Sequence, residues 1–157
     1  MMPNQTPDSV LHLLTARLAA RGLTVSCAES CTGGLLAAEF TRLPGSSAWF
    51  ETGFVTYSNE AKQRLLGVSA DSLRQYGAVS EAVVHEMAAG ARQAADADYA
   101  LSISGIAGPD GGSPEKPVGT VCFGLADRQT TYARTARFNG TLHMGHAFQQ
   151  TLMDTLI

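Results

Sequence analysis

Residues 28–34 read AESCTGG, a set of residue types that could hold an anion beside a nucleophilic hydroxyl group. A predicted strand precedes Ser30 and a helical pattern follows Gly34, so the segment is expected at a strand-to-helix junction, where α/β proteins commonly bind ligands. Glycines such as Gly33 let a ligand approach the backbone, and the first turn of a helix attracts anions. The alternative is a helix capped by Thr32, with the glycines serving only close packing. Neither a Walker A loop nor a Gly-x-Ser-x-Gly elbow is present.

A second candidate is the glycine-rich stretch 102–112, SISGIAGPDGG, which follows a predicted strand. The loop that it opens, residues 105–119, is about 15 residues long, and loops of that length in a compact domain are commonly functional. Its backbone amides could surround a sugar or a phosphate. The alternative is a flexible surface connection, although three prolines would stiffen it.

The third candidate is the pair Tyr57 and Lys62. A serine hydroxyl needs a nearby base, and a desolvated lysine can serve because burial lowers its pKa. Tyr57 could relay a proton. Lys62 lies one helical turn after Ser58, and spacing alone leaves open that it is a solvated surface lysine.

Metal binding has little support in the sequence, so no metal or other cofactor is expected. His143 and His146 have the i, i+3 spacing of one helix face, without a closely flanking acidic residue, and an ordinary polar face explains them. Cys27 and Cys31 lack the spacing of a zinc knuckle or redox pair. With Cys122 they make an odd number of cysteines, which indicates free thiols in a reducing compartment.

The hydrophobic periodicity predicts a three-layer α/β fold with a mixed, mostly parallel sheet, because strands and helices alternate and a hairpin comes late. The predicted strands cover residues 23–27, 50–57, 99–103, 120–126 and 130–138. The first of them alternates apolar and polar residues and is expected to be half-buried. The predicted helices cover residues 6–22, 32–43, 58–66, 71–76, 80–91 and 141–157. Thr6, Ser58 and Ser80 are expected to cap the helices that begin with them.

The composition indicates one globular domain over residues 1–157. The formal net charge is −3 and basic residues are scattered, which disfavours a nucleic-acid partner. No apolar stretch approaches the ~20 residues that span a bilayer, and the N-terminus does not resemble a signal peptide. We therefore expect a cytoplasmic protein with no membrane association.

Together these segments resemble the CinA C-terminal domain family, which includes bacterial nicotinamide mononucleotide amidases of the PncC type. Further matching motifs are PGSSAWF at 44–50, GFVTYSNEAK at 53–62, GAVS at 77–80 and KPVGTV at 116–121. The resemblance implies a CinA-like fold, often a homodimer, and a small-molecule nucleotide substrate. It implies hydrolysis of the carboxamide of nicotinamide mononucleotide to nicotinic acid mononucleotide and ammonia, a step of pyridine nucleotide salvage.

Carried over to this sequence, the resemblance makes Ser30 the nucleophile, Lys62 its base and Tyr57 an aid to proton transfer. It also implies substrate contacts from Thr32, Gly33, Gly34, Ser47, Ser104, Gly105, Ala107 and Gly108.

One departure concerns residues 138–146, FNGTLHMGH, where the family usually continues with an acidic residue and arginines that would hold the substrate phosphate. This difference predicts weak binding of nicotinamide mononucleotide. Two other functions therefore stay open: a nucleotide-binding or regulatory module without turnover, and a hydrolase for a phosphate-free amide.

Overall fold

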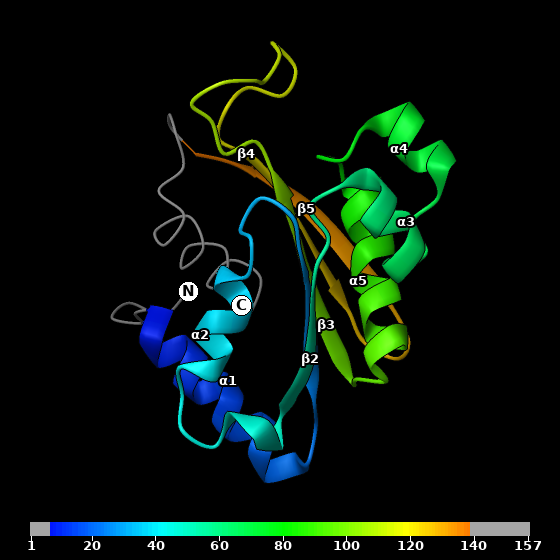
Figure 1. Ribbon diagram of the computed structural model, residues 1–157. Coiled ribbons are helices and arrows are strands. Elements are labelled where there is room, and N and C mark those ends of the chain that lie inside the picture. Colours follow the sequence, from blue (N-terminus) through cyan, green and yellow to red (C-terminus); the bar gives the residue numbers. More distant parts are fainter. Residues whose placement is uncertain (1–6, 139–157) are drawn as a thin grey trace.

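The computed structural model describes residues 7–138 and contains a five-stranded mixed sheet in the order β2-β1-β3-β4-β5 (Figure 1). The strands are β1 (Val25–Glu29), β2 (Phe50–Val55), β3 (Tyr99–Gly105), β4 (Thr120–Ala126) and β5 (Thr131–Arg137). β1 is parallel to β2 and β3, whereas β4 is antiparallel to both β3 and β5. Only β4 therefore runs against the other described strands, which confirms the expected mixed, mostly parallel sheet.

Helices cover both faces of the sheet and make three layers. α1 (Pro7–Arg21) and α2 (Leu35–Thr41) lie on one face, and α3 (Asn59–Leu66), α4 (Ala70–Tyr76) and α5 (Glu81–Ala95) lie on the other (Figure 1). The second face carries the helices that follow β2. The active-site candidates on α3 and at the end of β1 can therefore meet across this face.

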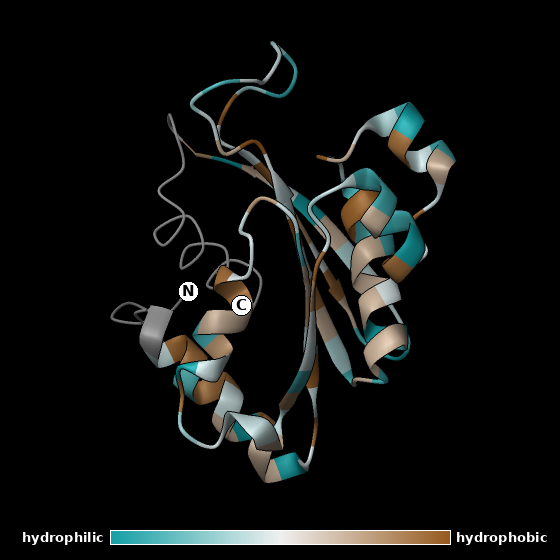
Figure 2. Cartoon of the chain, in the orientation of Figure 1, coloured by the Kyte–Doolittle hydropathy of each residue, from teal (hydrophilic) through white to brown (hydrophobic). Residues whose placement is uncertain are grey.

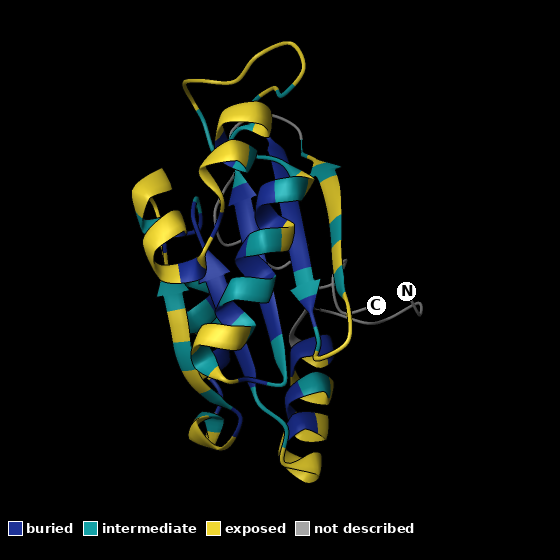
Figure 3. Cartoon of the chain, turned by 90° about the vertical axis from the view of Figure 1, so that its right-hand side faces the viewer, coloured by how far each residue is buried: buried dark blue, intermediate teal, exposed yellow. Residues whose placement is uncertain are grey.

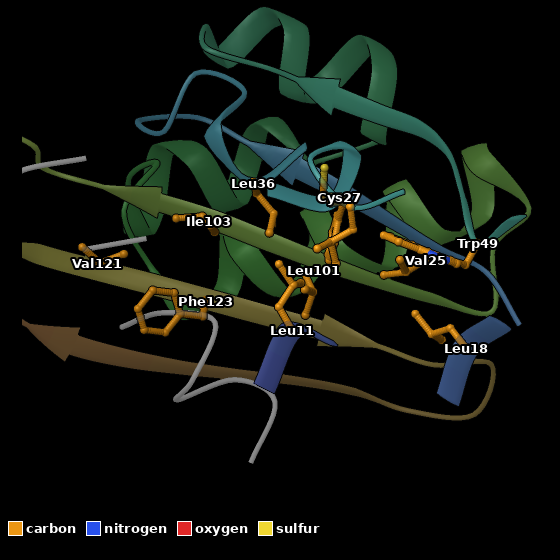
Figure 4. Packing of buried hydrophobic residues seen from close by; sticks show 12 residues of the cluster. Leu11, Leu18, Val25, Cys27, Leu36, Trp49, Leu101, Ile103, Val121 and Phe123 are labelled. Atoms are coloured by element: carbon orange, nitrogen blue, oxygen red, sulfur yellow. The ribbon is translucent and has the colours of Figure 1, made fainter. Parts of the chain in front are cut away.

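Each layer of helices packs on its own hydrophobic cluster. Figure 4 shows the cluster on the α1–α2 face, to which Val25 and Cys27 of β1 and Leu36 of α2 all belong. Ala28, the next residue of β1, instead joins the cluster beneath α5. Successive strand residues point to opposite faces, so β1 contributes to both clusters. Apolar residues line the central strands and the sheet-facing helices, and hydrophilic residues gather on α3 and α4 (Figure 2).

The first strand differs from its prediction in position and burial. It begins at Val25, two residues later than expected, and all five of its residues are buried. The expectation of a half-buried strand is wrong because β1 lies between β2 and β3 with helices on both faces. Figure 3 shows the central strands mostly in the colour of buried residues.

Most of the other predicted elements are confirmed. Ser58 caps α3, Ser80 caps α5, and β4 and β5 form the predicted hairpin. The cap proposed at residue 6 and the tail helix proposed at 141–157 lie outside the described residues. Within residues 7–138, no helix has the length and apolar character needed to cross a membrane.

Candidate active site

Ser30 and Lys62 meet where β1 ends. The backbone N–H of Ser30 donates to the carbonyl of Ile103 at 3.1 Å, which continues the pairing of β1 with β3 by one residue. Lys62 reaches this point from α3, and its Nζ lies 3.0 Å from Oγ of Ser30. The two side chains therefore have the hydrogen-bond contact that a nucleophile and its base require.

Lys62 is buried, with 1% of its surface exposed. The alternative of a solvated surface lysine, which spacing alone left open, is therefore wrong. Its Nζ also lies 2.8 Å from the carbonyl oxygen of Thr56 and 3.3 Å from that of Tyr57. Within residues 7–138, no carboxylate forms an ion pair with it. Desolvation lowers the pKa of Lys62, an effect that exceeds the opposing influence of Cys31.

This environment suits a neutral amine because burying an unpaired ammonium group is costly. A neutral amine has two hydrogens, which the carbonyls of Thr56 and Tyr57 can accept, and one lone pair, which can accept the hydroxyl hydrogen of Ser30. The three contacts of Nζ thus match the geometry of a general base directed at Ser30.

The position of Lys62 depends on how α3 packs. Ser58 caps the first turn of the helix, and Gly67 ends it in a left-handed conformation with φ of 71°. α3 rests on α5 at Gly90, where an added Cβ atom would lie 1.9 Å from the carbonyl oxygen of Leu66. The absence of a side chain at Gly90 therefore permits the close approach that holds Lys62 over the sheet.

Glu29, the residue before Ser30, is fully buried, and its carboxylate organises the turn that follows. Oε1 accepts hydrogen bonds from the hydroxyl of Thr32 at 2.6 Å and from the N–H groups of Gly34 and Leu36 at 3.2 and 2.9 Å. Oε2 accepts from the N–H of Ala37 at 3.1 Å. A carboxylate at a helix N-terminus is favourable, so Glu29 fixes the start of α2 and the turn that carries Ser30.

This arrangement corrects two predictions about the turn. Thr32 is not the cap of α2, because Gly34 precedes the helix with φ of 113° and the hydroxyl of Thr32 donates to Glu29. The first turn of α2 is also not an open anion site, since the Glu29 carboxylate occupies the N–H groups of Gly34, Leu36 and Ala37 and the N–H of Gly33 donates to the carbonyl of Ser30.

Sequence reasoning missed the role of Glu29. The available signal was an acidic residue at the end of an apolar strand and directly before a helix, where a carboxylate and the free N–H groups attract each other. It also missed Thr56, which is fully buried and whose carbonyl binds Lys62. No local pattern indicates that contact.

Ser104 and Gly105 lie near the nucleophile, and their expected contact with a substrate stays a prediction. Ser104 is buried at the end of β3. A Cβ atom added to Gly105 would lie 3.2 Å from Sγ of Cys31, so the end of β3 closely approaches the turn after Ser30. Ala107 and Gly108 follow in the loop and are partly buried.

Ser47 is not brought to this end of the sheet. It lies in the short helix η1 (Ser46–Ala48) before β2, and the parallel register pairs Val25 with Phe50 at the start of both strands. Ser30 follows the opposite end of β1. Within one chain, the expected contact of Ser47 with a substrate at Ser30 is therefore not supported.

Tyr57 contributes its backbone rather than its phenol to the observed contacts. Its carbonyl accepts from Lys62, whereas its side chain is 74% exposed. The observed contact with Lys62 is thus made by the backbone of Tyr57, and the part of its phenol in proton transfer stays a prediction.

The described residues contain no cluster of three or more His, Cys, Asp or Glu side chains suited to a metal ion. Cys27, Cys31 and Cys122 are free thiols. His143 and His146, the weakly indicated metal pair, lie outside the described residues, as does the altered stretch 139–146.

Comparison with known protein families matches residues 8–156 to the CinA C-terminal domain. The chain belongs to the CinA C-terminal domain family. It is 68% identical over 113 residues to the nicotinamide-nucleotide amidohydrolase PncC of Enterobacter agglomerans, covering 72% of this chain and 69% of that protein. It is 69% identical over 109 residues to the PncC of Escherichia coli strain K12, covering 69% of this chain and 66% of that protein.

The fold of this family member also matches solved structures. The crystal structure of the competence damage-inducible protein A from Klebsiella pneumoniae aligns with a TM-score of 0.87 and 38% identity, covering 97% of this chain and 93% of that one. The α/β architecture is therefore that of the CinA superfamily.

Proposed function

We propose that this chain hydrolyses the carboxamide of nicotinamide mononucleotide, giving nicotinic acid mononucleotide and ammonia. The observation that carries the proposal is the 3.0 Å contact between the buried amine of Lys62 and the hydroxyl of Ser30. The substrate class follows from the two relatives named nicotinamide-nucleotide amidohydrolase.

In the first half of the reaction, Oγ of Ser30 attacks the carboxamide carbon and its proton passes to Nζ of Lys62. The tetrahedral intermediate then collapses, its C–N bond breaks, and the proton on Lys62 moves to the departing nitrogen, which leaves as ammonia. The product of this half-reaction is an ester between Ser30 and the nicotinoyl group.

In the second half, water attacks the ester while Lys62 accepts one of its protons. The C–O bond to Ser30 breaks, the proton returns to Oγ, and nicotinic acid mononucleotide is released. Tyr57 is proposed to assist these transfers from the surface side. No metal or organic cofactor enters any step.

The decisive experiment measures ammonia release from nicotinamide mononucleotide, nicotinamide riboside and free nicotinamide. We expect turnover of the mononucleotide, lost in Ser30→Ala. Turnover of the riboside alone would instead indicate a phosphate-free amide as substrate, and binding of the mononucleotide without turnover would indicate a regulatory module.

We further propose that the protein acts as a cytoplasmic homodimer, as its family resemblance implies. Analytical ultracentrifugation at micromolar concentration tests the dimer, and a purely monomeric species would refute it. Cell fractionation tests the compartment.

A further inference from the structure

A hollow lined by residues of α4, α5, β4 and β5 opens on the α5 face of the sheet. It has a volume of about 580 Å³, within the range of small-molecule sites. Its lining includes Tyr76 at the end of α4, Glu81 at the start of α5, and Lys116, Cys122 and Arg137 from the loop and the last two strands. None of these residues takes part in the bond-breaking and proton-transfer steps at Ser30 and Lys62.

The hollow lies in line with Ser30 across the sheet. The N–H of Ser30 continues the register of β1 with β3, which places it level with Ser104. Ser104 pairs with Cys122, and Cys122 pairs with Thr135. Neighbouring strands lie about 4.8 Å apart, so Cys122 is about 10 Å from Ser30, and the hollow starts there.

These residues also share one face. Cys122 belongs to the cluster beneath α5. The hydroxyl of Ser102, two residues before Ser104, donates to the carbonyl of Val84 in α5 at 2.6 Å. Lys62 meets Ser30 from α3, which packs on α5. The reacting carboxamide and a group in the hollow would therefore lie on the same side of the sheet.

Two cationic side chains in the hollow, Lys116 and Arg137, have more N–H donors than the hydrogen bonds described for them use. Nζ of Lys116 donates to the carbonyl of Tyr76, and Nη2 of Arg137 donates to the carbonyl of Glu115 at 2.9 Å. Within residues 7–138, neither cation forms an ion pair with a carboxylate. An ammonium has three donors and a guanidinium five, so each group can still bind an anion.

Two carboxylates, Glu81 and Glu115, also line the hollow, which makes its charge mixed rather than purely basic. An oxygen of Glu81 already accepts the hydroxyl of Thr135 at 2.8 Å. Acceptors of this kind suit the hydroxyl groups of a ribose.

We propose that this hollow holds the phosphate of the nucleotide substrate, with Lys116 and Arg137 as its ligands. The inference rests on the proposed amidase function and extends it. The ribose would span the interval of about two strand spacings between the hollow and Ser30. Phosphate recognition would then come from the described part of the chain rather than from the arginines that residues 138–146 lack.

Kinetics of Lys116→Met and Arg137→Met test the assignment. A hydrogen bond to a charged group contributes enough that its loss weakens binding about tenfold to a hundredfold. We expect each variant to raise KM for nicotinamide mononucleotide by about that factor, with kcat nearly unchanged. Kinetics on the riboside, which has no phosphate, should not change if the wild type accepts it.

The matched control is Arg134→Met, which removes the same charge from the same strand. Arg134 lies an odd number of residues from Arg137, so its side chain points to the other face of β5. The KM of Arg134→Met for nicotinamide mononucleotide should equal that of the wild type. An unchanged KM in both Lys116→Met and Arg137→Met would overturn the phosphate site.

Calorimetry separates this proposal from the amidase function. If the wild type releases no ammonia, the function is wrong, yet titration with nicotinamide mononucleotide still tests the hollow. Weaker binding by both variants than by the wild type supports the site. Equal affinities, or no binding by the wild type, refute it.

Discussion

The amine of Lys62 lies 3.0 Å from the hydroxyl of Ser30, across 32 positions of sequence. Lys62 gives its other contacts to the carbonyls of Thr56 and Tyr57, not to a carboxylate. A lysine held in this way is biased toward the neutral state, because its desolvation is not offset by an opposite charge. The pair is thereby prepared for proton transfer before any substrate arrives.

Replacing Ser30 with alanine should abolish ammonia release while the protein stays folded. Loss of a nucleophile commonly costs several orders of magnitude in rate. Ser72→Ala, which removes a hydroxyl from α4 away from the site, is the control and should keep the wild-type rate. A Ser30→Ala protein that retains more than about a tenth of the activity would exclude the covalent mechanism.

The rate should rise with pH as Lys62 loses its proton. Because burial lowers the pKa of Lys62 from its ordinary value of 10.5, the rise should occur below that pH. The ammonium form cannot accept the proton of Ser30, so activity falls as the pH decreases through the lowered pKa.

Two variants test whether Lys62 acts as a general base or only supplies a positive charge. Lys62→Met should be inactive, and Lys62→Arg should be inactive too, because a guanidinium stays protonated. Arg64→Met, on the same helix, should keep the wild-type profile. If the ionisation persisted in Lys62→Met, another group would be the base.

The stability of the protein should also depend on the ionisation of Lys62. Between the lowered pKa of Lys62 in the folded state and its ordinary value of 10.5 in the unfolded chain, the unfolded state binds more protons. The free energy of unfolding should therefore increase with pH across this interval. Urea unfolding at several pH values measures the slope, and Lys62→Met should reduce it. If the free energy of unfolding of Lys62→Met had the same slope against pH as that of the wild type, the lowered pKa of Lys62 would be contradicted.

Replacing Glu29 with glutamine should destabilise the protein and lower kcat. One carboxylate oxygen would become an NH₂ group facing the N–H of Ala37 or the donors at Thr32 and Leu36. A buried donor without its acceptor costs about 1–3 kcal/mol, so we expect a loss of at least about 2 kcal/mol in the free energy of unfolding.

The control for this variant is Glu39→Gln on α2, whose carboxylate forms a partly exposed i, i+3 ion pair with Arg42. Such pairs contribute about 0.3–0.5 kcal/mol. Denaturant midpoints measure both effects. Equal, small losses would show that the Glu29 carboxylate does not hold the turn.

An alanine at Gly90 should push α3 away from α5. Its Cβ atom would overlap the carbonyl of Leu66, and overpacking of this kind costs about 1–3 kcal/mol, more than the ~1 kcal/mol gained in helix propensity. Because α3 carries Lys62, ammonia release should fall as well. Gln93→Ala, on the exposed side of α5, should change neither property; similar behaviour of both variants would disprove the contact.

Local sequence patterns were sufficient for the order of the elements and for several of their boundaries. Ser58 and Ser80 were recognised as helix caps because a cap needs only a hydroxyl and the amides a few residues later. The hairpin of β4 and β5 was likewise predicted from two strand patterns around a short turn. The motif containing Ser30 was placed correctly after a strand for the same reason.

Only the tertiary structure decided what surrounds those residues. Spacing could not distinguish a buried Lys62 from a solvated one, because its burial depends on α3 docking at Gly90. Nor could it show that Glu29 occupies the amides at the start of α2, since that depends on a buried side chain folding back over its own turn.

The sequence alone determined which side chains could perform the chemistry, because nucleophile, base and loop residues are recognisable by type and motif. The tertiary structure decided which of them meet. Parallel pairing of β1 with β2 separates Ser47 from Ser30, while pairing of β1 with β3 brings Ser104 beside Ser30. Strand order and register are set by the packing of distant segments into common cores, and this information is not contained in any short stretch of the chain.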